Sequence, residues 1–78
     1  MQDISKNTII TLNNNEGYFV ASITDYKDSS YALLINVNKD DDNMIVKKII
    51  ENNEVVLEVV DNKIELSSLQ LLLQENLD

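Results

Sequence analysis

The 78-residue chain carries fourteen Asp and Glu against six basic residues, which gives it a net charge of −8, and it contains no histidine or cysteine. These counts exclude imidazole acid–base chemistry, thiolate nucleophiles, disulfides and cysteine-based zinc sites. The acidity disfavours direct binding to nucleic acid or to an anionic membrane, while the apolar content predicts one folded domain over residues 1–78.

Strand patterns fill the first sixty residues. The predicted strands, rich in β-branched and aromatic residues, cover 8–12, 18–26, 31–37, 44–50 and 54–60. The segments between them, rich in Asn, Asp and Ser, predict turns at 13–17, 27–30, 38–43 and 51–53. Because the turns are short, successive strands should pair as antiparallel hairpins and form a meander.

The apolar spacing becomes helical after residue 61. Four leucines follow the helical period: Leu66, Leu69, Leu73 and Leu77. Asn62 followed by Glu65 has the residue types of a capping box, which favours a helix that begins there. The alternative is a short strand at 64–66 with the helix beginning after Ser67 or Ser68. Either way the predicted fold class is α+β, a five-stranded antiparallel meander (β-β-β-β-β-α) with one C-terminal helix packed on one face.

Alternation along the strands predicts which apolar side chains turn away from the helix. These residues are Tyr18, Val20, Leu34, Val56 and Val60. Either a strongly curled sheet hides them, or they form an exposed patch that docks a partner or a second copy of the chain. The same alternation places Phe19, Ala21 and Ile23 together on one face.

Carboxylates concentrate in the loop before the fourth strand and in the last hairpin. They are Asp40, Asp41 and Asp42, and then Glu51, Glu54 and Glu58. The loop begins like an EF-hand from Asn38 onward, but Asn43 replaces the required glycine and Ile49 the bidentate glutamate. Nothing in the pattern predicts a pocket that would tune a carboxylate for catalysis. We therefore expect no metal, no cofactor and no catalytic residue, and we interpret the six carboxylates as a surface that attracts a basic protein partner.

Two segments carry a family likeness. The first is Tyr31-Ala32-Leu33-Leu34 after the strand from Phe19 to Tyr26, and the second is Leu57-Glu58-Val59-Val60 before the spaced leucines of the helix. In this order they resemble the YrzB-like family of short acidic bacterial proteins, a domain of unknown function. Members usually have a glycine in the second turn, which here is Lys27-Asp28-Ser29-Ser30. The resemblance implies a strand-rich fold and a cytosolic location, and it brings no activity, cofactor or catalytic residue.

Together these features predict a small non-enzymatic, cytoplasmic protein that binds or regulates another protein, with homodimerisation left open. No export signal pattern opens the chain, and the longest apolar run, 31–35, is too short to span a membrane. The alternative is a phage-type inhibitor that imitates DNA and occupies the groove of a nuclease, glycosylase or polymerase. Its small size and acidity fit, whereas the placement of three aspartates in a loop fits less well.

Overall fold

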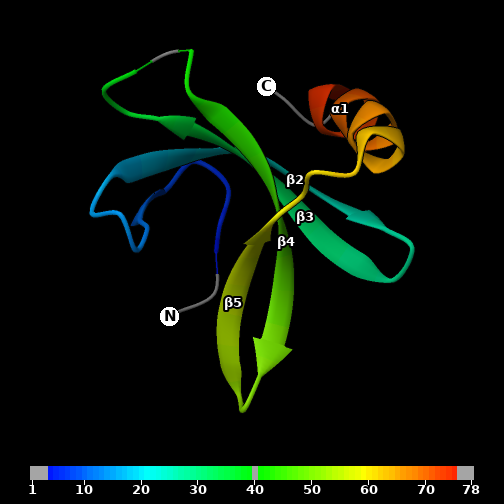
Figure 1. Ribbon diagram of the computed structural model, residues 1–78, viewed down its shortest axis with the longest axis horizontal. Helices are drawn as coiled ribbons and strands as arrows, with labels where there is room; N and C mark the ends of the chain where they lie inside the picture. Colours follow the sequence, from blue (N-terminus) through cyan, green and yellow to red (C-terminus); the bar gives the residue numbers. More distant parts are fainter. Residues whose placement is uncertain (1–3, 40, 76–78) are drawn as a thin grey trace.

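The structure is a computed structural model that describes residues 4–39 and 41–75. Five strands form one antiparallel sheet in chain order, and a helix follows them (Figure 1). The elements are β1 (Ile9–Thr11), β2 (Gly17–Tyr26), β3 (Ser29–Asn36), β4 (Asn43–Glu51), β5 (Glu54–Val59) and α1 (Lys63–Glu75). The predicted meander with a C-terminal helix is confirmed.

Two-residue turns join β2 to β3 and β4 to β5. Their central residues, Lys27-Asp28 and Asn52-Asn53, all have positive φ angles between 49° and 65°. Two successive positive φ angles are the mark of the type I′ turn, whose twist matches that of a hairpin. The second turn is therefore shorter than predicted, and Ser29 and Ser30 already belong to β3.

A β-bulge in β2 changes the facing of its side chains. Val20 lies opposite Leu34, but the register resumes with Ser22 opposite Leu33. Ala21 is therefore the extra residue, and every side chain after it is moved to the other face of the sheet.

The bulge makes the predicted common face of Phe19, Ala21 and Ile23 wrong. Phe19 lies opposite Ile35, whereas Ile23 lies opposite Ala32, which is three residues before Ile35 in β3. Since neighbouring residues of a strand point to opposite faces, an odd offset between Ile35 and Ala32 separates Phe19 from Ile23.

Apolar clusters fill both faces of the sheet. On the helix face, α1 buries Leu69 and Leu73 against Tyr31 and Ile45. The opposite face, which we call the N-terminal face, has its own buried cluster of Ile4, Tyr18, Val20, Ala32, Leu34 and Val46. Partly buried Ile10 and Leu12 add to it, so the segment 4–12 covers this face.

The helix begins where the sequence predicts. Asn62 Oδ1 accepts hydrogen bonds from the backbone N–H groups of Ile64 (3.0 Å) and Glu65 (3.1 Å), so Asn62 is the N-cap. The Glu65 carboxylate accepts a hydrogen bond from Tyr31 Oη at 3.4 Å. Burial first, and then the charge and hydrogen bond of Glu65, raise the pKa of the Tyr31 hydroxyl above its ordinary value.

Another polar contact ties the other end of α1 to the sheet. Ser22 Oγ donates a buried hydrogen bond of 2.7 Å to the backbone carbonyl of Leu73. The last four carbonyls of a helix lack intrahelical donors, so this bond satisfies one of them. Leu77, the last predicted leucine of the stripe, lies outside the described residues. Within residues 4–39 and 41–75 no helix is long and apolar enough to cross a membrane.

Candidate functional site

The structure corrects the predicted apolar docking face. Tyr18, Val20 and Leu34 do face away from the helix, but they are only 1%, 0% and 0% exposed. They belong to the cluster that the segment 4–12 covers, so this segment, and not the curling of the sheet that the alternative invoked, buries them, and they form no exposed docking patch. Val56 and Val60 were placed on the wrong face, because the register puts Val56 on the helix side and Val60 packs against the helix cluster.

The predicted carboxylates do not form one surface. Asp41 and Asp42 precede β4, whereas Glu51 and Glu54 flank the turn that follows it (Figure 1). The nine residues of β4 rise about 3.3 Å each, so its two ends lie about 26 Å apart. Asp41 and the three glutamates Glu51, Glu54 and Glu58 are exposed, and Asp40 lies outside the described residues.

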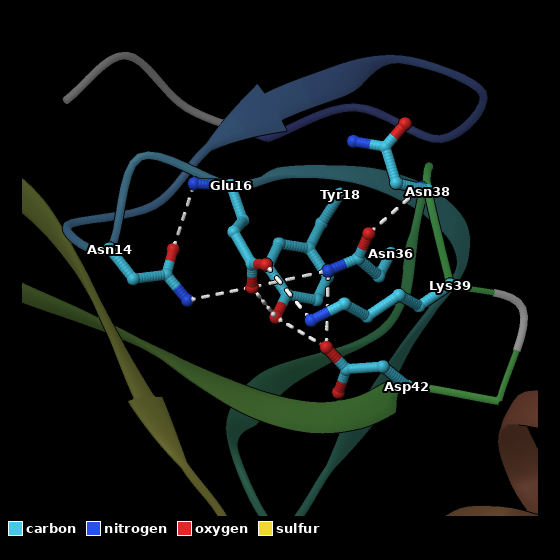
Figure 2. A network of polar contacts seen from close by, with 7 residues as sticks. All are labelled: Asn14, Glu16, Tyr18, Asn36, Asn38, Lys39 and Asp42. Carbon is cyan, nitrogen blue, oxygen red and sulfur yellow. Dashed lines mark hydrogen bonds and ion pairs between the residues drawn. The ribbon is translucent and has the colours of Figure 1, made fainter.

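Asp42 belongs to a polar network centred on Asn36, which is 1% exposed (Figure 2). Asn36 Nδ2 donates to Glu16 Oε2 at 3.2 Å and to Asp42 Oδ2 at 3.1 Å. Asn36 Oδ1 accepts from the backbone N–H of Asn38 at 2.8 Å. Tyr18 Oη lies 3.1 Å from Asp42 Oδ2 and 3.4 Å from Glu16 Oε2, and its single proton can serve only one of them at a time.

The network fixes two loops against the strand ends. Glu16 also accepts from Asn14 Nδ2 at 3.2 Å and lies 3.5 Å from Lys39 Nζ. The loop after β1 and the loop between β3 and β4 are thereby tied together. Asp42, predicted to meet a partner, is instead occupied by internal donors. In the described part of the chain, no group of three or more acidic side chains is placed to hold a metal ion.

A cleft of about 540 Å³ opens on the helix face between α1 and strands β3 and β4. α1 packs mainly on β2 and β3 and meets β4 at Ile45, which is 5% exposed, and the cleft opens beside this contact. The lining residues are Leu33, Ile35, Asn43, Met44, Ile45, Val59, Val60, Leu66, Gln70, Leu73 and Gln74. Sequence reasoning missed this cleft; Gln70 and Gln74, one turn apart beside the leucine stripe, were its only sequence signal.

None of the eleven lining residues carries a charge, although the chain has a net charge of −8. They also include no acid, base or nucleophile, so they offer apolar contacts and amide hydrogen bonds but no catalytic group. Exposed carboxylates stand next to them in the chain: Asp61 follows Val60, and Glu75 follows Gln74. A volume of this size with an apolar lining and a few amides is typical of a binding site.

No family model matches the chain, and neither curated proteins nor solved structures match it. The resemblance to the YrzB-like family therefore stays a prediction.

Proposed function

We propose that the protein is a non-enzymatic, cytoplasmic binding or regulatory protein whose cleft receives an apolar segment of a basic partner protein. The observation that carries the proposal is the uncharged cleft lining in a strongly acidic chain. An apolar side chain that enters the cleft would leave water and contact Leu33, Ile35 and Leu66, which line the cleft and are partly exposed. Each Å² of apolar surface removed from water contributes about 25 cal/mol.

The exposed carboxylates supply the second part of the proposal. Asp61 and Glu75 adjoin lining residues in the chain, and Asp41 lies two residues before the lining residue Asn43. Lysine or arginine residues that flank the apolar segment of the partner would be attracted toward these carboxylates during encounter. Such attraction speeds association and sets specificity more than it adds to affinity, and salt weakens it.

Imitation of DNA is the alternative, supported by the net charge and by the exposed carboxylates of β5. It has less support than the cleft because Glu54 and Glu58, four residues apart in a strand, are separated by about 13 Å. Each DNA strand carries a charge about every 3.4 Å of helix axis. The carboxylate row on β5 is therefore much sparser than the phosphate row it would have to imitate.

Site-specific photo-crosslinking tests the proposal. A photoreactive amino acid replaces Gln70, an exposed residue that lines the cleft, and as a matched control it replaces Leu71, which is 67% exposed and does not line it. We expect adducts in bacterial lysate from position 70 only, formed with an apolar peptide segment flanked by Lys or Arg, and with a yield that falls as salt rises. The proposal is refuted if both positions label the same proteins. DNA mimicry gains support if duplex DNA displaces the captured partner.

A further inference from the structure

In the part of the chain that the structure describes, β5 is an edge of the sheet without a bulge, proline or lysine. The sheet has β1 and β5 at its two edges, and β1 is only three residues long. β5 pairs with β4 without interruption from Val59 opposite Val46 to Glu54 opposite Glu51. Natural edge strands are commonly protected by short length, bulges, proline or lysine. β5 has six residues, pairs with β4 without a bulge, and contains neither proline nor lysine.

The backbone of β5 presents hydrogen-bonding groups to this edge. The N–H of Val60 donates to the carbonyl of Ile45 at 2.9 Å, so these two residues form a hydrogen-bonded pair. In an antiparallel ladder such pairs alternate with pairs that are not hydrogen-bonded. Residues 54, 56 and 58 therefore turn their N–H and C=O groups toward β4. Val55, Leu57 and Val59 turn theirs toward the open edge.

The side chains of β5 give this edge a charge preference. Glu54, Val56 and Glu58 point to one side of the strand, and all three are exposed. A second copy that paired antiparallel about Val56 would set Glu54 of one chain opposite Glu58 of the other. Like charges directly opposite each other destabilise a strand pair, whereas opposite charges stabilise it. In that register the two glutamates repel a second copy, and in any register they attract a basic strand.

We propose that β5 accepts an extended segment in which Lys or Arg alternates with aliphatic residues, and that this segment adds to the sheet as a further strand. Strand addition of this kind takes its affinity from main-chain hydrogen bonds and its specificity from alternate side chains. Basic residues would lie opposite Glu54, Val56 and Glu58, and aliphatic residues opposite Val55, Leu57 and Val59. The inference goes beyond the proposed function and uses a different surface, although Val59 and Val60 also line the cleft and a strand paired with β5 would run past its mouth.

The test uses the whole protein and a capped nine-residue peptide that alternates lysine and valine, with a glutamate–valine peptide as the control. Hydrogen exchange is followed by NMR on the ¹⁵N-labelled protein. We expect the lysine peptide alone to slow amide exchange at Val55, Leu57 and Val59. We expect the double variant Glu54→Gln, Glu58→Gln to bind it about 10-fold more weakly. Val59→Pro removes an outward N–H without touching the bonds to β4, and should abolish the protection.

The outcomes separate this inference from the proposed function. The edge inference is overturned if the glutamate peptide binds equally well, if neither peptide binds, or if only the amides of Gln70 and Gln74 respond. The last result would leave the cleft proposal standing. If the β5 amides of the wild-type protein are protected from exchange without any peptide, and if this protection increases with protein concentration, the occupant is a second copy. That result would also overturn the edge inference. If the β5 amides respond but the crosslinker at Gln70 captures nothing specific, the cleft proposal fails and the edge inference stands.

Discussion

The hydrogen bond from Ser22 to the carbonyl of Leu73 predicts a large effect from removing a single oxygen atom. Ser22 is 0% exposed, and its Oγ lies 2.7 Å from that carbonyl oxygen. In Ser22→Ala the carbonyl stays in the last turn of α1, buried against the sheet, without the hydroxyl that donates to it in the wild-type protein. Leaving a buried acceptor unsatisfied costs about 1–3 kcal/mol. We expect the free energy of unfolding to fall by about 2 kcal/mol.

That loss is large for a chain of this size. Small domains have a stability of roughly 0.05–0.15 kcal/mol per residue, which amounts to about 4–12 kcal/mol here. A loss of about 2 kcal/mol should also lower the unfolding midpoint by roughly 8–16 °C, since 1 kcal/mol shifts Tm by about 4–8 °C in a small domain.

Ser67 offers a matched control on the same helix. Its Oγ donates to the carbonyl of Lys63 at 3.1 Å, but this bond is exposed. In Ser67→Ala water replaces the hydroxyl, and alanine has the higher helix propensity. We expect the free energy of unfolding to stay within about 0.5 kcal/mol of wild type.

Urea unfolding followed by far-UV circular dichroism measures both variants. The m-value should stay unchanged, because neither substitution alters the surface exposed on unfolding. Equal effects of Ser22→Ala and Ser67→Ala would refute the reasoning, since burial is the main difference between the two bonds. A loss below about 0.5 kcal/mol for Ser22→Ala would refute it too, because it would mean that water satisfies the carbonyl.

Three further predictions follow from local geometry. Asn53→Gly should raise the free energy of unfolding by about 0.5–1 kcal/mol in urea titrations, because Asn53 has a φ of 65°, which glycine adopts without strain; an unchanged or lower value would contradict this. Asn36→Asp places a third carboxylate beside Glu16 and Asp42, and it should lower the free energy of unfolding by about 3 kcal/mol at neutral pH. Acidification should restore this stability, and a loss that does not depend on pH would contradict the charge explanation. The raised pKa of Tyr31 means that the folded state holds this proton more tightly than the unfolded chain, so its stabilisation is complete below about pH 10 and is lost as pH rises through the raised value. Tyr31→Phe should therefore lose less stability than wild type between neutral pH and pH 11 in thermal unfolding, and parallel losses would contradict this.

The elements of this fold were predictable because their signals are local. The turn residues Asn52-Asn53 act through their own backbone angles, and the N-cap Asn62 acts through a side chain that bonds residues two and three positions on; the structure places them as predicted. The facing of side chains was not predictable in the same way. Ala21 introduces a bulge without the glycine that often marks one, and it reverses the rest of β2. Val56 and Val60 were misplaced because the face to which a side chain points depends on which residues of neighbouring strands pair. This pairing cannot be read from one segment alone.

The cleft was missed for a related reason. The leucine stripe predicts that α1 packs on the sheet, but it does not say over which strands. The structure ties the helix at both ends, through Leu73 to Ser22 on β2 and through Glu65 to Tyr31 on β3. Neither bond joins residues that are close in sequence, so neither could be expected from a local pattern.

The same two bonds explain why a cleft exists at all. Ser22 reaches the helix only because the bulge at Ala21 turns it to the helix face, and Tyr31 reaches Glu65 from the neighbouring strand. Both anchors lie on β2 and β3, so α1 packs mainly over these strands and meets β4 at Ile45, and the cleft stays open beside that contact. A buried polar bond is rarely the most favourable way to pack a helix, since it contributes only about 1 kcal/mol net when it is made. Its effect here is positional: it selects the placement of α1 that leaves an uncharged, apolar surface open beside β5.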